Sequence, residues 1–134
     1  MSARVRARLL PVLVAAAGCA APMRPLRVTV AETSGDVAFS LETPVERVAC
    51  GVRDLRRETT DPAAYREIWA AQCRDTCQAA INYGDRTLEH SRPPEALVPS
   101  PEGLCYECLL EGRGGRGVIR FRIGRHGGVE PCRL

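Results

Sequence analysis

Seven cysteines in 134 residues are the feature that most constrains how this chain can fold. Six of them lie between positions 50 and 132, and an exported domain of this size with an even number of cysteines is typically held by disulfides. Three bonds are therefore predicted, each worth typically about 2–5 kcal/mol, which is a large part of the stability of a small domain. The sequence alone does not choose among the pairings of Cys50, Cys73, Cys77, Cys105, Cys108 and Cys132.

The N-terminal segment has the pattern of a secretory signal peptide. Three arginines lie within the first eight residues, an apolar run follows over 9–17, and small residues end it. That run is too short to span a bilayer, which needs about 20 apolar residues. Its end, Ala16-Ala17-Gly18-Cys19, resembles the lipobox of bacterial lipoprotein precursors, in which the cysteine is lipidated and becomes the first mature residue. The alternative is ordinary cleavage after Ala15-Ala16-Ala17, which would leave Cys19 spare.

The lipoprotein resemblance implies a location and a domain division. Ala20 follows the cysteine, and the absence of Asp at this position favours the outer membrane in a bacterium with two membranes. One acyl chain anchors a protein only weakly, whereas lipoproteins of this type carry two or more. We therefore expect an exported lipoprotein that the lipid anchors in the outer membrane. Its parts are a signal peptide over 1–18, a tether lipidated on Cys19 over 19–25, and one disulfide-rich domain over 26–134.

Arginine supplies all 19 basic residues, and lysine is absent. Without a lysine amine the chain cannot form a Schiff base or place a P-loop lysine on a phosphate. Three of the arginines belong to the signal peptide, so the mature chain balances 16 arginines against 16 acidic residues. A neutral domain of this kind is not expected to bind nucleic acid, because that binding depends on positive charge. The chain also lacks the G-x-S-x-G and H-E-x-x-H motifs, so we predict no catalytic residues.

The pair Cys105-x-x-Cys108 suggests a thiol-redox site, in which a helix N-terminus would stabilise the reactive thiolate. Here the pair lies in the run 104–110, whose alternation predicts a strand. Residues three apart on a strand point to opposite faces, so the two thiols are expected to bond to different partners. Zinc is a third interpretation, with Cys73-x-x-x-Cys77 as a second ligand pair. We favour structural disulfides, with no metal and no cofactor.

Alternating apolar residues predict a mainly β, sandwich-like domain. Thr33-Ser34-Gly35-Asp36 is a turn sequence between the first two strands, and glycine-rich turns are expected at 112–117 and 125–128. Residues 85–102 contain four prolines and His90, and they are expected to form a long irregular connection. The predicted strands are 27–31, 37–41, 47–53, 104–110, 118–123 and 129–134.

Residues 61–80 support two interpretations. Asp61-Pro62 is a helix-start signal, and a helix would align the residues that recur every four positions from Tyr65 to Ile81. Alternatively, the segment around Trp69 is a core strand, as in immunoglobulin-like sandwiches. The local signals favour a helix near 61–80, which would make the domain mainly β with one helix, or α+β. The aromatic residues expected in the core are Trp69, Tyr83 and Tyr106.

The run Gly112-Arg113-Gly114-Gly115-Arg116-Gly117 matches the G-x-G-x-x-G spacing of dinucleotide-binding loops. That motif works where a helix follows it, whereas here a strand is predicted, so we interpret the run as a hairpin loop. Its arginines and those beyond it make a basic stripe. The stripe could contact an anionic lipid or an acidic envelope protein, or it could protect a sheet edge from aggregation. The stripe consists of Arg113, Arg116, Arg120, Arg122 and Arg125.

More loosely, residues 66–130 resemble small uncharacterised β domains of bacterial secreted proteins and lipoproteins. The shared pieces are Trp69, Tyr83-Gly84, Gly103-Leu104-Cys105-Tyr106, Phe121-Arg122 and Gly127-Gly128-Val129. The resemblance implies a mainly β domain without known activity, and it favours a strand at Trp69. We therefore predict a non-enzymatic, membrane-anchored module that binds or supports another envelope component. The alternative is a thiol-redox protein that uses Cys105 and Cys108.

Overall fold

The computed structural model describes residues 23–132 of the chain. The expected signal peptide over 1–18 and the expected lipidation site at Cys19 lie outside the described residues. Two sheets and three disulfides make up the described part, so the predicted mainly β, disulfide-stapled, sandwich-like domain is confirmed. No helix among residues 23–132 is long and apolar enough to cross a membrane.

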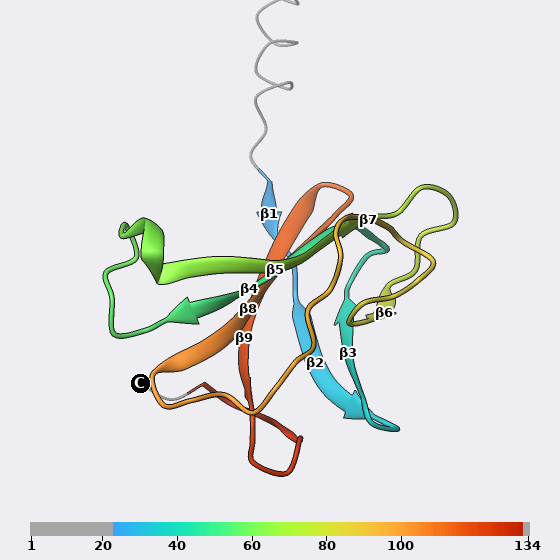
Figure 1. Cartoon of the computed structure of the whole chain (residues 1–134). Coiled ribbons are helices and arrows are strands. Elements are labelled where there is room, and N and C mark those ends of the chain that lie inside the picture. The colour runs from blue at the N-terminus through green and yellow to red at the C-terminus, as the bar shows by residue number, and fades with distance from the viewer. Residues whose placement is uncertain (1–22, 133–134) are drawn as a thin grey trace, which may run out of the picture.

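The larger sheet has two long strands side by side at its centre, β4 (Val45–Asp54) and β8 (Leu104–Gly112) (Figure 1). Its pairings are antiparallel except that of β1 with β9, which is parallel. β1 uses two residues that the sequence assigned to the tether, so the sheet begins before the expected domain start at residue 26. In spatial order the strands are β1 (Arg24–Pro25), β9 (Gly115–Ile123), β8 (Leu104–Gly112), β4 (Val45–Asp54), β5 (Tyr65–Gln72) and β7 (Glu89–Arg92), and β10 (Val129–Glu130) also pairs with β9.

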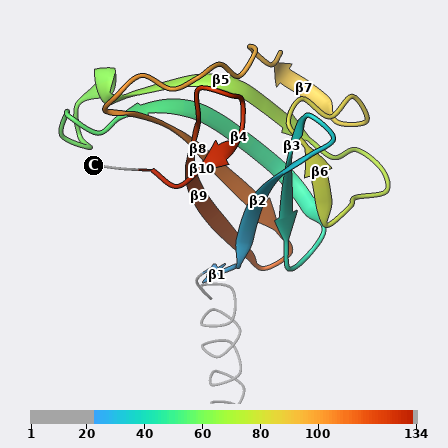
Figure 2. The same ribbon diagram turned by 90° about the horizontal axis from the view of Figure 1, so that it is seen from below.

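The smaller sheet has the order β2 (Val28–Thr33), β3 (Asp36–Leu41), β6 (Ala80–Asn82). The chain passes from the large sheet to the small one at buried Leu26, whose backbone N–H donates to the carbonyl oxygen of Arg116 at 2.8 Å. The predicted turn between β2 and β3 is present, with positive φ angles of 51° at Ser34 and 85° at Gly35. Figure 2 shows the large sheet curving over the small one, so each sheet offers one face to the core.

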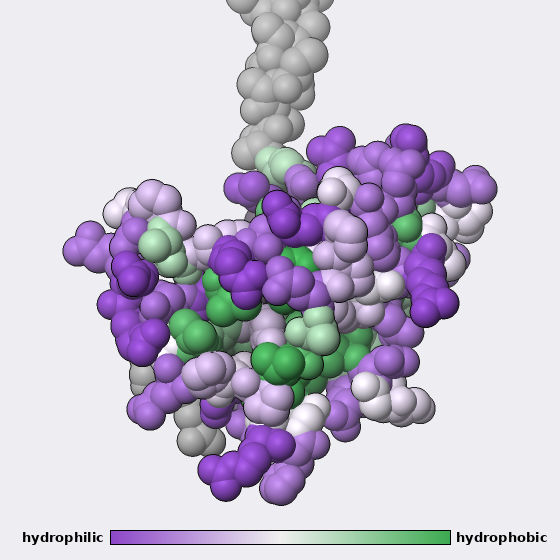
Figure 3. Space-filling view, in the orientation of Figure 1, coloured by the Kyte–Doolittle hydropathy of each residue, from purple (hydrophilic) through white to green (hydrophobic). Residues whose placement is uncertain are grey.

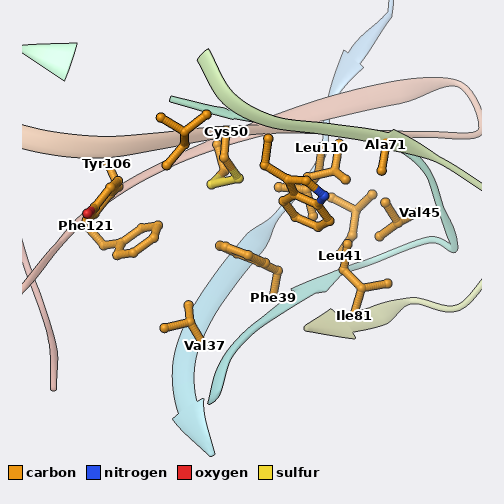
Figure 4. Packing of buried hydrophobic residues seen from close by; sticks show 14 of the residues in the cluster. Val37, Phe39, Leu41, Val45, Cys50, Ala71, Ile81, Tyr106, Leu110 and Phe121 are labelled. Carbon is orange, nitrogen blue, oxygen red and sulfur yellow. A yellow bond between two sulfur atoms is a disulfide. The ribbon is translucent and has the colours of Figure 1, made fainter. Parts of the chain in front are cut away.

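The core fills the space between the two sheets. Phe39 from β3 is fully buried and lies with its ring centroid 5.9 Å from that of Phe121 on β9 (Figure 4). Trp69 from β5 is also fully buried, and its ring meets that of Tyr83 edge-on at 4.9 Å. Trp69 and Tyr106 are buried and Tyr83 is half-buried against the same cluster, so the prediction that these aromatics belong to the core is confirmed.

The expected helix near 61–80 is wrong beyond its first turn. Asp61 does cap a helical turn, because its Oδ1 accepts the Ala63 backbone N–H at 2.8 Å, but the turn is a 3₁₀ segment, η1 (Pro62–Ala64), that ends at once. The strand β5 follows, which agrees with the alternative interpretation of a core strand around Trp69. A bulge opposite Cys50 and Gly51 lets two consecutive residues, Ile68 and Trp69, both be buried. This bulge breaks the simple alternation by which a strand is recognised.

The glycine-rich run is a tight hairpin, as predicted from the strand that follows it. Gly112 pairs with Gly115, so only Arg113 and Gly114 form the turn between β8 and β9, and Gly114 has a positive φ of 76°. The next two glycines lie where β1 and Leu26 cross β9. A Cβ on Gly115 would stand 2.4 Å from the Arg24 carbonyl oxygen, and one on Gly117 would stand 2.6 Å from that of Leu26. The absence of a side chain at Gly115 and Gly117 therefore lets the backbone of residues 24–26 approach β9 closely.

Candidate apolar cavity and the residues around it

The six cysteines of the domain form three disulfides. Cys50 and Cys108 lie directly opposite each other on β4 and β8 and are bonded inside the core, with their Cα atoms 4.1 Å apart. Cys105 bonds to Cys132 near the end of the chain. The third bond, Cys73–Cys77, closes a loop after β5. The pairing confirms that the two cysteines of the C-x-x-C motif point to opposite faces of one strand and have different partners.

Beneath the large sheet lies a half-open cavity of about 370 Å³. Its roof is the inner face of the sheet, at the end of β4 and at the starts of β5 and β8. Its floor is the segment 93–103 between β7 and β8, which we name the strap. In the space-filling view, hydrophobic residues are exposed in a hollow on this side of the molecule (Figure 3). Its lining includes Val52, Ile68, Leu104 and Tyr106 from the sheet, and Ala96, Val98 and Pro101 from the strap.

Two tyrosines hold the strap in place. The Tyr106 hydroxyl accepts the Val98 backbone N–H at 2.9 Å and donates to the Val98 carbonyl oxygen at 3.1 Å. The Tyr83 hydroxyl donates to the Glu95 carbonyl oxygen at 2.6 Å, and burial of its ring raises the pKa of Tyr83, so this donor keeps its proton. At its far end the strap is tied to β9, because Ser100 exchanges two hydrogen bonds with Ile123.

The cavity is lined mainly by apolar side chains. Its charged lining residues are Arg66 and Glu95, which form an exposed ion pair with each other at 2.8 Å. Its other polar side chains are Ser100, whose Oγ already accepts the Ile123 N–H, and Tyr106, whose hydroxyl is taken by Val98. Each of these polar side chains thus already has a partner, and a volume of this size is typical of a binding pocket for a small ligand.

His90, expected in an irregular loop, lies on the edge strand β7 instead. Its ring meets that of Trp69 edge-on with centroids 6.0 Å apart, and its Nε2 lies 2.8 Å from the Asp85 carbonyl oxygen. The long connection predicted over 85–102 is thus interrupted by a strand, which separates a turn region over 85–88 from the strap. The sequence missed β7 because its residues, Glu89–Arg92, are all polar and pair with only a few residues of β5.

The arginine stripe predicted from the sequence does not act as one unit. Three of its members alternate with buried residues on the outer face of β9, and the other two lie in turns at opposite ends of that strand. Arg120 donates to Glu107 at 2.7 Å, and Arg122 donates to the Ser100 carbonyl oxygen at 2.7 Å and pairs with Glu130 at 3.4 Å. The other three stripe arginines, Arg113, Arg116 and Arg125, form no salt bridge within residues 23–132.

Glu107 is the centre of a charge cluster on the outer face of the large sheet. Arg53 donates to its carboxylate at 2.6 Å and Arg120 does so at 2.7 Å, and the Arg53 guanidinium lies 4.9 Å from the centroid of the Tyr65 ring. Burial by itself raises the pKa of Glu107, but the two arginines outweigh it and lower the pKa below its ordinary value. Such mutual satisfaction is typical of a structural cluster, and it leaves no group free for acid–base chemistry.

The zinc interpretation required thiolates at Cys73, Cys77, Cys105 and Cys108. All four are disulfide-bonded, and within the described range of 23–132 no three His, Cys, Asp or Glu side chains come together as a metal site.

Sequence reasoning did not identify the residues of the cavity. Val52 and Leu104 fall in predicted strands, Ile68 falls in the segment with two interpretations, and Ala96 and Val98 fall in the predicted long connection. The available signal was the proline-rich composition of 93–101, because prolines keep a segment from pairing as a strand. The chain has no match among protein-family models, curated proteins or solved structures.

Proposed function

We propose that this protein is a lipid-anchored module of the bacterial cell envelope that binds an apolar group of another envelope component and catalyses no reaction. The segment Ala16-Ala17-Gly18-Cys19, with its resemblance to a lipobox, supports the anchor. Three disulfides within the domain fit an oxidising compartment outside the cytoplasm.

The observation that carries the binding role is the cavity beneath the large sheet. Val98, at its floor, is 53% exposed, which is a large exposure for an apolar residue next to a core. The walls around it are fixed, because the strap is tied down by Tyr83, Tyr106 and Ser100. A preformed apolar space binds without first ordering its walls, which reduces the entropic cost of binding.

A neutral fluorescent apolar probe, N-phenyl-1-naphthylamine, tests the cavity in the mature protein. We expect Ala96→Phe to fill the space and to weaken probe binding at least tenfold. Ala79→Phe is the matched control, because Ala79 is an exposed alanine outside the cavity, and it should leave binding unchanged. Equal binding by both variants, with unfolding curves that match the unsubstituted protein, would remove the cavity from the proposal.

The anchor is tested by the intact mass of protein purified from membranes and alkylated with and without reduction. We expect a mature N-terminus at Cys19 that carries acyl mass, and six alkylations that appear only after reduction. An unlipidated N-terminus beyond Cys19 would exclude the anchor. Alkylation of Cys105 or Cys108 without reduction would contradict the disulfide framework and favour the thiol-redox alternative.

A further inference from the structure

Exposed apolar side chains gather where the described chain begins. Among residues 23–132 the large hydrophobic residues that are exposed are Met23, Val98 and Val118, and Val98 belongs to the cavity. The other two line one shallow hollow beside β1, with Met23 47% exposed and Val118 56% exposed. Val118 stands on the outer face of β9, next to the pairing of β1 with that strand. Apolar pairs of this kind at one spot mark contact surfaces more often than scattered single residues do.

Positive side chains surround this hollow. Arg24 and Arg116 line it, and Arg113 stands in the adjoining β8–β9 turn, which lies beside β1 in Figure 1. Two acids face the same region: Glu42 lies 3.7 Å from Arg24, and Glu111 stands opposite Arg116 in the strand register. The arginines outnumber the acids, so the surface suits an anionic layer.

The length of the chain fixes how far this hollow can be from an anchor. Four residue steps separate Cys19 from Met23, and an extended chain covers at most about 3.6 Å per residue, which gives roughly 14 Å. If Cys19 carries acyl chains, the hollow cannot leave the neighbourhood of the lipid headgroups.

We propose that this end of the domain, defined by Met23, Arg24, Arg113, Arg116 and Val118, rests on the anionic lipid surface that holds the anchor. The proposal rests on the lipid anchor put forward above. Met23 and Val118 enter the interface between headgroups and acyl chains, and the arginines bind lipid phosphates. In this orientation the strap and the cavity, on the inner side of the large sheet, stay open to a partner in the surrounding space.

The test compares two exposed valines in lipidated protein reconstituted into vesicles of phosphatidylethanolamine and phosphatidylglycerol with brominated acyl chains. Val118→Trp and Val98→Trp place a tryptophan at sites with similar exposure, 56% and 53%, on opposite sides of the sheet. Trp69 is fully buried and gives the same background in both variants. We expect bromine to quench the fluorescence of the V118W variant at least threefold more than that of the V98W variant. Adding Arg113→Gln and Arg116→Gln should reduce that difference.

Equal quenching at both sites, or stronger quenching at position 98, in protein that floats with the vesicles would overturn the proposed orientation while leaving the anchor intact. Protein that does not float with the vesicles would overturn the anchor and the orientation together. If the tryptophan introduced at position 118 is shielded in native membranes but unquenched in vesicles, the surface belongs to a protein partner instead of lipid.

Discussion

The inner face of the large sheet is covered in two different ways. Over one half, the small sheet supplies Phe39, Leu41 and Ile81, which are at most 5% exposed and belong to the core cluster. Over the other half, the strap covers Val52 and Leu104 incompletely and leaves the cavity. We call these the closed half and the open half. One sheet thus provides both the stable core and the candidate binding site.

The difference follows from what each cover can form. A strand paired at both edges points every second side chain at the facing sheet, so β3 delivers three large apolar residues within five positions. The strap contains Pro93, Pro94, Pro99 and Pro101, which cannot donate the hydrogen bonds of a ladder. It is held instead by tyrosine hydroxyls, and the apolar side chains that it offers to the cavity are small. Exposed apolar surface is therefore built into the open half.

The largest difference between the halves is expected from truncation of a covering side chain. Phe39→Ala empties a fully buried site in the closed half and should lower the free energy of unfolding by about 3–5 kcal/mol. Val98→Ala removes an exposed side chain from the open half and should change it by less than about 0.5 kcal/mol. Urea unfolding of both variants provides the measurement. Similar losses would show that the strap stabilises the sheet as much as the small sheet does.

Two disulfides offer a second contrast. Cys50–Cys108 closes a loop with a sequence separation of 58 residues inside the core, while Cys73–Cys77 spans 4 residues in a surface loop. In the chain-entropy model their removal as alanine pairs should cost about 4 and about 2 kcal/mol, respectively. Thermal unfolding of the two double variants measures this. A reversed order would mean that the short loop at the end of β5 stabilises the native state beyond its effect on the unfolded chain.

The sequence was sufficient where local pattern and tertiary structure agree. The strands around Val30, Phe39, Cys50, Leu110 and Phe121 all have clear alternation or paired turns, and each was placed within a few residues of its observed position. The opposite orientation of Cys105 and Cys108 followed from the period of a strand. Their partners did not follow from any local pattern. The bond of Cys108 to Cys50 depends on the register between β4 and β8, and that of Cys105 to Cys132 depends on where the segment after β10 returns.

The segment around Trp69 shows why local reasoning failed elsewhere. The four-residue recurrence from Tyr65 to Ile81 is a coincidence of spacing, because Tyr65 lies on the outer face of β5 and Ile81 belongs to a different sheet. The Asp61 cap is real, but pairing with β4 outweighs any helix beyond the first turn. The cavity escaped prediction for a related reason: its walls come from three strands and a strap that meet only in the folded chain.

Removal of one hydroxyl should loosen the open half alone. Tyr106→Phe deletes the group that binds both the N–H and the carbonyl oxygen of Val98, and it should cost about 1 kcal/mol. We expect faster hydrogen exchange at the Val98 amide and unchanged exchange in β3. Tyr65→Phe is the control, since the Tyr65 hydroxyl makes no side-chain hydrogen bond within residues 23–132. If exchange rises equally in both halves, the strap and the small sheet open as one unit.

The smallest effect on stability is expected from protonation of Glu107, which lies on the outer face of the large sheet, behind the open half. Its folded-state pKa is lowered from an ordinary 4.5, with hydrogen bonds from Arg53 and Arg120 outweighing the opposing effect of burial. The unfolded state therefore binds the proton more readily, so the stabilisation is complete above pH 4.5 and is lost as the pH falls through the lower folded value. Partly exposed ion pairs contribute at most about 1 kcal/mol.

In a plot of unfolding free energy against pH, Glu107→Gln should flatten the acid limb. Glu46→Gln is the control and should leave that limb unchanged, because Glu46 is exposed and has no salt bridge among residues 23–132. Equal acid limbs in the two variants would show that the cluster around Glu107 contributes nothing measurable to the stability of the domain.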